Sequence, residues 1–329
     1  MPEENFRSYT EQTVHYFDRL DSGVLDHALD VPAAWRGGEV ADDPGWHHRL
    51  SPEEVAELDA ALVVAQASGR PRGALECEDF PLPTLAARVG DWRQELSSGR
   101  GFLVVSGVPV ERWSEEEAST FFWALGLHLG TPGAQNPEGD LLGHVVDTGD
   151  DSADPLVRLY RTSSDIAYHC DAADVVGLLC LTKAKSGGLS RIASSVTVWN
   201  EVVRRRPDLA PRLFEPFALD IRNEERPGMA GWLPIPPCRY GEGRLETFYH
   251  SDYFRSAPRH ADAPPLCGRD LELLDLYEEI AESPEIRLDM DLEPGDVQLL
   301  SNHTVIHART GYEDTPAARR HLLRLWLSL

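Results

Sequence analysis

The sequence predicts a mainly β protein of the α+β class, in which helices flank a β-sandwich or barrel. From about residue 140, short β-prone runs alternate with glycine and proline turns such as Ser186-Gly187-Gly188 and Pro294-Gly295-Asp296. Before residue 101, the chain instead shows helical periodicity and loops. This change of pattern favours a β core that follows a mainly helical part.

Helices are expected where a capping residue precedes a periodic run of apolar residues. Ser51, followed by Pro-Glu-Glu, is expected to cap a helix over residues 51–67. Ser114, followed by three glutamates, is expected to cap a helix over 114–127. The same periodicity predicts further helices over 83–96, 196–206 and 271–281.

Strands are expected where short apolar or alternating runs lie between turn residues. The run at 101–107 begins and ends with glycine and is apolar between them, which is typical of a buried strand. Further strands are predicted over 142–146, 176–181, 190–194, 244–249, 297–300 and 321–328. The segment 227–237, Pro-Gly-Met-Ala-Gly-Trp-Leu-Pro-Ile-Pro-Pro, is expected to be a rigid, irregular connector.

The composition excludes several classes of function. The formal net charge is −24, from 31 Lys and Arg against 55 Asp and Glu, so we expect neither nucleic acid nor a membrane surface as a partner. The five cysteines include no C-x-x-C pair, and the first residues have no leader pattern. The longest apolar-rich run, 101–110, is far too short to span a bilayer. We therefore expect a soluble protein of the reducing cytoplasm.

Three residues have the chemistry of a metal site. His169 and Asp171 lie at i and i+2, so on an extended segment they would project to the same face. His307 follows the later predicted strand. Two imidazoles and one carboxylate form the facial triad of non-haem Fe(II) oxygenases, which leaves three metal positions open. The alternative for the His169–Asp171 pair is an ordinary structural hydrogen bond.

The predicted C-terminal strand carries two arginines on one face. With a period of two, Arg320 and Arg324 project to the same side as Leu322 and Trp326. A guanidinium among apolar neighbours is costly unless it is paired, and a dicarboxylate cosubstrate would supply the partner. The alternative is a strand edge that faces solvent.

These residues, in this order and at these spacings, resemble the taurine dioxygenase (TauD/TfdA)/clavaminate synthase-like family of Fe(II)/2-oxoglutarate-dependent oxygenases. The resemblance runs over about residues 101–329. It implies a double-stranded β-helix, the jelly roll of cupin-like proteins, within one catalytic domain over 1–329. Residues 1–100 would pack on this core as a mainly helical part, and the core would carry an insert at about 196–290.

The family's roles carry over residue by residue. His169, Asp171 and His307 match the iron ligands, with His303 as a rival for the distal position. Arg320 and Ser190 match the residues that bind the far carboxylate of 2-oxoglutarate. Arg324 matches a position that contacts cosubstrate or substrate in relatives. The resemblance implies that Fe(II), 2-oxoglutarate and O₂ are used to hydroxylate, desaturate or cyclise a substrate at an unactivated C–H, with release of succinate and CO₂.

The substrate is expected to be a small molecule, such as an amino acid or a natural-product intermediate. The candidate substrate residues are Gln135, Asn136, Arg222, Arg226, Tyr240, Tyr249 and Tyr253. The aromatic run 248–255 would be either a lid or part of the core. A zinc-type hydrolase on the same fold and a non-catalytic jelly-roll binding protein remain as alternatives, and the oligomeric state is left open.

Overall fold

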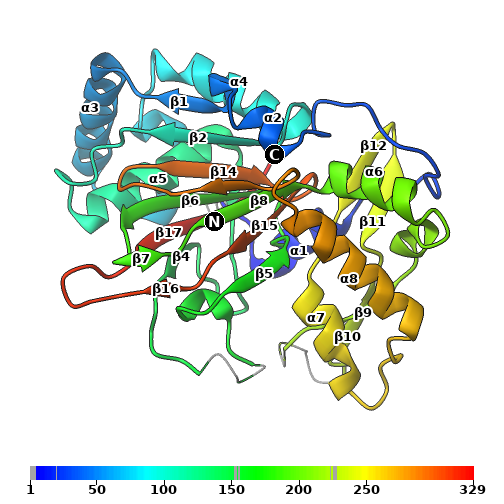
Figure 1. Ribbon diagram of the computed structural model, residues 1–329. Coiled ribbons are helices and arrows are strands. Elements are labelled where there is room, and N and C mark those ends of the chain that lie inside the picture. Colours follow the sequence, from blue (N-terminus) through cyan, green and yellow to red (C-terminus); the bar gives the residue numbers. More distant parts are fainter. Residues whose placement is uncertain (1–4, 20, 152–153, 155, 223, 225–227) are drawn as a thin grey trace.

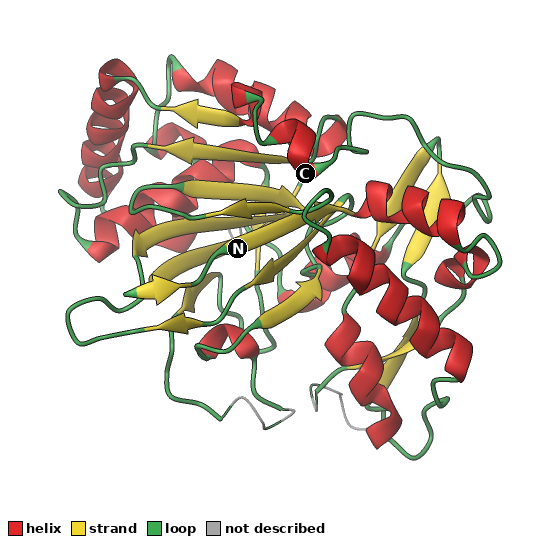
Figure 2. Cartoon of the chain, viewed as in Figure 1, coloured by secondary structure: helices red, strands yellow, loops and turns green. Residues whose placement is uncertain are grey.

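The core of the protein consists of two β-sheets with helices outside them (Figures 1 and 2). The computed structural model describes residues 5–19, 21–151, 154, 156–222, 224 and 228–329. The larger sheet has the strand order β1-β2-β14-β6-β17-β3, and β4 also pairs with β17. The smaller sheet has the order β13-β8-β15-β5. The mainly β core with flanking helices that the sequence predicts is therefore confirmed.

The larger sheet contains β1 (His47–Arg49), β2 (Phe102–Ser106), β14 (Val297–Ser301), β6 (Val175–Thr182), β17 (His321–Ser328), β3 (Thr131–Gly133) and β4 (Leu142–Val145). The smaller sheet contains β13 (Leu288–Met290), β8 (Ser190–Ser194), β15 (Val305–Arg309) and β5 (Ile166–His169). The helices are α1 (Tyr9–Phe17), α2 (Gly37–Val40), α3 (Pro52–Ser68), α4 (Leu85–Ser98), α5 (Glu115–Leu129), α6 (Ser195–Arg205), α7 (Ser251–Ser256) and α8 (Gly268–Glu282). None of these described helices has both the length and the apolar character needed to cross a membrane.

Helices α4 and α5 pack on one face of the larger sheet, and α3 packs on α5 (Figure 1). The predicted N-caps are confirmed, because Ser51 and Ser114 each form a capping box with the glutamate three residues later. Leu325 of β17 contacts this helical layer so closely that a Cβ on Gly126 of α5 would lie 2.4 Å from its Cδ2 atom. The glycine therefore lets helix and sheet approach.

The opposite face of the larger sheet covers the interior between the two sheets. Leu322 and Trp326 of β17 pack there with Val176 of β6 and Ile192 of β8. The leucines at 323, 325 and 327 belong to the separate core under the helices. This alternation places the side of β17 that carries Arg324 toward the interior.

An insert over residues 195–287 connects β8 to β13 and occupies the right of Figure 1. It contains α6, α7 and α8 together with two short hairpins, and its core includes Trp199 and Tyr277. The hairpin strands are β9 (Phe217–Asp220) with β10 (Trp232–Ile235), and β11 (Cys238–Gly241) with β12 (Arg244–Thr247).

Two local predictions were wrong. The segment expected to be an irregular connector over 227–237 contains β10, which pairs with β9; its Pro234 is tolerated because this small sheet has only edge strands. Asp171 does not lie on the extended segment of His169, because β5 ends at His169 and the carboxylate follows in a turn. The predicted strand and helix positions elsewhere agree with the structure to within a few residues.

A pair of alanine substitutions tests the turn between β7 (Ser186–Gly187) and β8. Gly187 has φ +77°, and a Cβ there would lie 2.2 Å from the carbonyl oxygen of Gly311. Gly187→Ala should lower the free energy of unfolding by about 2–4 kcal/mol, from backbone strain and overlap together. Gly69 also has a positive φ, +65°, but nothing lies within 4 Å of its Cβ position. Gly69→Ala should therefore cost only about 1 kcal/mol in urea unfolding, and equal losses would contradict the packing described.

Candidate active site

The pairing of β5 with β15 brings the two predicted histidine ligands together. His307 lies directly opposite His169 in this antiparallel pair, and the ring centroids are 4.2 Å apart. Asp171 follows in the turn after β5, with Oδ2 3.6 Å from His307 Nε2. One ligand atom from each of the three residues lies within 4.8 Å of the others. The three side chains thus converge on one point.

Neighbouring polar groups orient these side chains. The Nδ1 atom of His169 hydrogen-bonds to the carbonyl oxygen of Ala167 at 2.9 Å, which leaves Nε2 directed to the centre. The buried amide of Asn302 accepts a hydrogen bond from the backbone N–H of Asp171 at 3.0 Å and donates one to the carbonyl of Ala173 at 2.9 Å. Asn302 therefore holds the turn that presents the carboxylate.

The donor set fits a divalent metal ion. Asp171 Oδ2 is buried and has no hydrogen-bond partner among the described residues. Burial, helped by the nearby His307, lowers the pKa of His169 to about 3, so the ring is neutral at pH 7. Burial alone would raise the pKa of Asp171, but Arg324 and the two imidazoles bring it well below the usual range. Neutral imidazoles and an ionised carboxylate are the forms that bind Fe(II).

His303 is engaged elsewhere. Its Nε2 atom lies 2.8 Å from Asp174 Oδ1, and its ring stacks on Tyr16 with centroids 5.1 Å apart. Burial lowers the pKa of His303, although Asp174 opposes this effect. The structure thus places His307, and not His303, with His169 and Asp171.

Arg324 lies beside the three residues. Its Nη1 atom is 3.6 Å from Asp171 Oδ1, and its Nε donates to Gln135 Oε1 at 2.7 Å. The Gln135 amide nitrogen in turn donates to the carbonyl of Arg324 at 2.9 Å. Gln135 therefore sits behind the arginine and fixes its guanidinium.

Arg320 is buried farther along the interior. Its Nη1 atom has no hydrogen-bond partner among the described residues, and its guanidinium lies 5.2 Å from the centre of the Tyr312 ring. Burial lowers the pKa of Arg320 below its ordinary value. A Cβ on Gly188 would lie 2.9 Å from Arg320 Nε, so the Gly187-Gly188 turn makes room for this side chain. Within the described part of the chain, Arg320 is therefore a buried cation that no carboxylate pairs with.

Sequence reasoning selected Ser190 in this interior but missed two polar residues, Gln298 and Arg309. Ser190 donates a hydrogen bond to Gln298 Oε1 at 2.9 Å, which links the two sheets. Arg309 lies opposite Ser190 in the pairing of β15 with β8, and its Nε and Nη1 atoms are buried without partners among the described residues. Burial and the charge of Arg320 lower the pKa of Arg309 to about 10. Arg309 lies two residues after His307 on the same strand, so its side chain projects to the same face as that histidine; this spacing could have identified it from the sequence.

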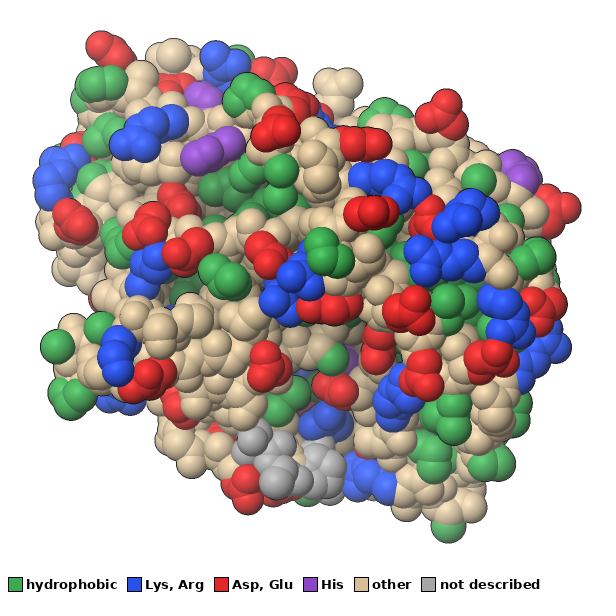
Figure 3. All heavy atoms as spheres, in the orientation of Figure 1, with side chains coloured by type: hydrophobic (Ala, Val, Ile, Leu, Met, Phe, Trp, Pro, Cys, Tyr) green, Lys and Arg blue, Asp and Glu red, His purple; other side chains and the backbone are tan. Residues whose placement is uncertain are grey.

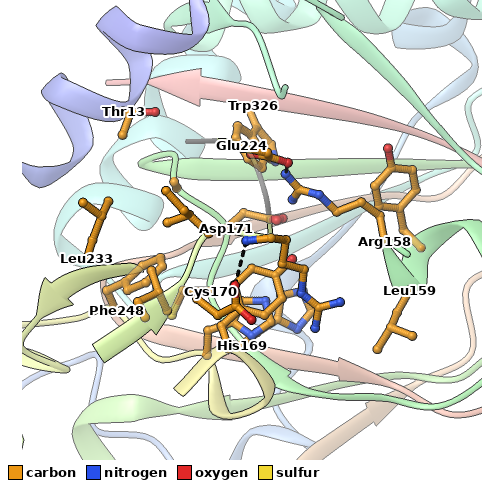
Figure 4. Close-up of a pocket in the computed structure, with 18 of the residues that line it drawn as sticks. Thr13, Arg158, Leu159, His169, Cys170, Asp171, Glu224, Leu233, Phe248 and Trp326 are labelled. Carbon is orange, nitrogen blue, oxygen red and sulfur yellow. Dashed lines mark hydrogen bonds and ion pairs between the residues drawn. The ribbon is translucent and has the colours of Figure 1, made fainter. Parts of the chain in front are cut away.

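A pocket of about 150 Å³ opens onto Asp171 and His169 (Figure 4). In Figure 4, Thr13, Leu233 and Phe248 lie on one side, and Arg158 and Leu159 lie on the other. Arg158 forms an ion pair with Glu224, which also accepts a hydrogen bond from Tyr9 at 3.0 Å. The lining also includes Phe17, Tyr160, Ile166, Leu219, Arg222, His250, Tyr253, Arg324 and Trp326.

The structure brings only some of the candidate substrate residues to this pocket. Arg222 and Tyr253 line it, with the guanidinium 4.2 Å from the centre of the ring. Gln135 is not among the lining residues and acts on the pocket through its hydrogen bond with Arg324. Arg226 lies outside the described residues.

The other candidates are held away from the pocket. Tyr249 is fully buried and stacks on Tyr277 in the core of the insert, with centroids 4.2 Å apart. Tyr240 packs against the same core. Asn136 hydrogen-bonds to Asp140 at 2.8 Å in a surface loop. The aromatic run 248–255 supplies both pocket and core, since Phe248 lines the pocket and Tyr249 does not.

The pocket residues Tyr9, Thr13 and Phe17 come from α1, where sequence reasoning placed no site residue. The capping box between Ser8 and Glu11 was a signal for this helix. The approach of α1 to the pocket is a tertiary contact that no local sequence pattern predicts.

Known proteins are similar to this chain in sequence and in fold. Residues 67–326 match the family model described as "Taurine catabolism dioxygenase TauD, TfdA family". FR-33289 synthase of Streptomyces rubellomurinus is 31% identical over 314 residues, covering 93% of this chain and 92% of the relative. The taurine hydroxylase-like protein SAT17 of Stachybotrys chartarum is 30% identical, covering 94% and 82%. The structure of an asparagine oxygenase with Fe(II), 3-hydroxyasparagine and succinate has a TM-score of 0.66 at 18% identity, covering 86% and 93%.

The chain belongs to the TauD/TfdA family. Its class is accordingly that of the Fe(II)- and 2-oxoglutarate-dependent dioxygenases, which use O₂, and the jelly-roll core is that of its structural neighbours. The family, the fold and the reaction class predicted from the sequence are thereby confirmed.

Asn302 offers a test of how the carboxylate turn is held. Asn302→Ala should lower the free energy of unfolding by about 2–4 kcal/mol, because a buried N–H and a buried carbonyl lose their partners. Asn136→Ala, on the surface loop, is the matched control and should cost less than about 1 kcal/mol. Urea unfolding monitored by circular dichroism measures both, and a silent Asn302→Ala would show that the turn is held by other contacts.

Proposed function

We propose that His169, Asp171 and His307 hold the Fe(II) of this dioxygenase. The observation that carries the proposal is the convergence of their ligand atoms within 4.8 Å, with Asp171 Oδ2 buried and without a partner. When bound with 2-oxoglutarate and O₂, the iron supplies the oxidising chemistry of the family, which releases succinate and CO₂ and oxidises a C–H bond. The carboxylate of Asp171 fills the position that would otherwise admit a halide, which supports oxygenation and not halogenation.

We propose that Arg320 and Ser190 bind the far carboxylate of 2-oxoglutarate. The buried Nη1 atom of Arg320 has no hydrogen-bond partner among the described residues, and a guanidinium binds a carboxylate best when both carboxylate oxygens reach it. Ser190 adds a hydroxyl group on the strand that lies next to β15, and this hydroxyl would turn from Gln298 to the cosubstrate. Arg309 and Gln298 extend the same polar patch between the sheets. A zinc hydrolase or a binding protein would have no use for this buried positive charge.

We propose that the substrate is a small polar metabolite, such as an amino acid or an amino-acid-derived natural product. The pocket is small, and its lining holds charged residues of both signs: Arg158, Arg222 and Arg324 with Asp171, Asp220 and Glu224. Aromatic and aliphatic residues, including Tyr253, Phe248 and Leu233, form the rest of the wall and suit a short apolar body. The names of relatives and structural neighbours, which mention taurine and 3-hydroxyasparagine, fit a small charged substrate.

We further propose that the protein works in the cytoplasm and without a nucleic-acid partner. All five cysteines are free. Acidic and basic side chains are interspersed over the face shown in Figure 3, where no continuous basic surface is visible. A phosphate backbone therefore finds no extended track on that face.

A succinate-release screen tests the function. The protein with Fe(II), 2-oxoglutarate and a panel of amino acids and polar metabolites should produce succinate, with a substrate product heavier by one oxygen or lighter by two hydrogens. His169→Ala, Asp171→Ala and His307→Ala should each abolish turnover and bound iron. His303→Ala, which leaves the centre intact, should keep most of both. Iron loss in His303→Ala, with retention in His307→Ala, would reverse the proposed ligand assignment.

Arg320 and Arg324 should separate cosubstrate from substrate binding. Arg320→Ala should weaken 2-oxoglutarate binding by about 2–5 kcal/mol, the usual effect of removing one partner from a buried charged pair. Ser190→Ala should cost about 1 kcal/mol. Arg324→Ala should instead raise the KM for the organic substrate identified in the screen. The assignment fails if Arg324→Ala loses 2-oxoglutarate and Arg320→Ala does not.

A further inference from the structure

A second group of metal-type ligands lies on the outer side of the larger sheet. Glu115 at the start of α5, His144 of β4 and His321 of β17 each offer one atom, and these atoms lie within 4.8 Å of one another. The two histidines hydrogen-bond between His144 Nδ1 and His321 Nε2 at 2.9 Å. Glu115 Oε1 lies 3.9 Å from His144 Nδ1, and Glu115 Oε2 lies 3.9 Å from the other ring nitrogen of His321, Nδ1. These three residues are called the outer cluster below.

Strand register explains why the two histidines meet. In the antiparallel pairing of β4 with β17, His144 lies opposite Leu323. His321 is two residues from Leu323, so His321 and His144 occupy a diagonal position on the same face of the sheet. Leu323 packs in the core under the helices, which identifies this as the outer face. The outer cluster is therefore separated from the candidate active site by the sheet itself.

The helix completes the cluster. Helix α5 begins after Ser114 and packs on β17, which brings its first turn to the end of that strand. The other acids of this turn are occupied, since Glu116 pairs with Arg72 and Glu117 bonds back to Ser114. Glu115 is directed to the histidines instead. Three elements that are far apart in sequence thus supply one donor each.

The geometry is close to that of a zinc site. Two nitrogen ligands held at about 2.0–2.1 Å from a tetrahedral Zn²⁺ lie about 3.3 Å apart, and a carboxylate oxygen lies at a similar distance from each. His144 Nδ1 lies 2.9 Å from His321 Nε2 and 3.9 Å from Glu115 Oε1, so the observed distances lie just below and just above that value. Glu115 and His144 are exposed, so water can complete the coordination. Imidazole nitrogens favour Zn²⁺ over Mg²⁺ or Ca²⁺, which prefer oxygen ligands.

We propose that Glu115, His144 and His321 form a second divalent-metal site that takes Zn²⁺ and is distinct from the iron centre. A bound ion would clamp β4, β17 and α5 to one another. His321 is adjacent in sequence to Arg320, so the clamp would hold the strand end from which that arginine enters the interior. The proposal rests on this cluster alone and stands or falls independently of the proposed iron ligands.

Zinc titration of the full, tag-free and metal-free chain tests the proposal. His307→Ala removes one ligand from the candidate iron centre, and this variant should still bind one equivalent of Zn²⁺ in calorimetry. Adding His144→Ala or His321→Ala should weaken that binding at least about tenfold, as expected for loss of a ligand. Glu115→Gln, which keeps the side-chain shape, should weaken it as well. His27→Ala in the same background is the control, because His27 is exposed and contacts only Asp26 among the acids described.

Thermal unfolding supplies a second readout. Zn²⁺ should raise the melting temperature of His307→Ala and should raise it less once His144 is also replaced, because ligand binding stabilises only the folded state. The same series in an Asp171→Ala background guards against a variant that fails to fold. No zinc bound by His307→Ala, or equal binding after His144→Ala is added, would overturn the proposal.

Discussion

Strand β5 pairs with β15 so that His169 lies directly opposite His307, and the candidate centre depends on this register. A slip of one residue in either strand would send one imidazole to the opposite face of the sheet. The same strand β15 pairs on its other side with β8, which places Arg309 opposite Ser190. One strand therefore aligns the candidate iron ligands with the candidate cosubstrate site. Asn302, just before β15, secures the turn that carries Asp171.

Buried charge is the second constraint. Asp171 lies beside Arg324, so its negative charge is balanced within the site. Burial lowers the pKa of both Arg320 and Arg309, and the charge of Arg320 also lowers that of Arg309. Neither guanidinium forms an ion pair with a carboxylate among the described residues, and each has buried nitrogen atoms without a hydrogen-bond partner there. Such an arrangement costs stability in the free protein and returns it when a dianion binds. Buried positive charge therefore lies at the proposed 2-oxoglutarate site.

Much of the fold and the chemistry was predictable from sequence because their signals are local. Ser51 and Ser114 each predict the start of a helix, because each forms a capping box with the glutamate three residues later. The alternation along β17 assigns Arg324 to one face without any knowledge of its neighbours. His169, Asp171 and His307 were identified because their order and spacing, together with Arg320, resemble those of the family's site residues; the His169–Asp171 pair alone is a weak signal.

Other features depend on contacts between distant segments. Tyr249 was chosen for the pocket because an aromatic residue suits a binding wall, but the same property suits the core in which it lies. Thr13 and Arg158 reach the pocket from α1 and from the loop before β5. Neither belongs to a local sequence pattern that predicts a site. Gln298 is one polar residue in an apolar strand, and its bond to Ser190 appears only when the two sheets face one another.

The most direct test is anomalous diffraction at the iron edge from crystals of the full chain grown without oxygen and loaded with Fe(II). We predict one strong peak within about 2.2 Å of His169 Nε2, a carboxylate oxygen of Asp171 and a ring nitrogen of His307, the usual metal–ligand distance. A peak coordinated by His303, or one that lacks Asp171 as a ligand, would contradict the account.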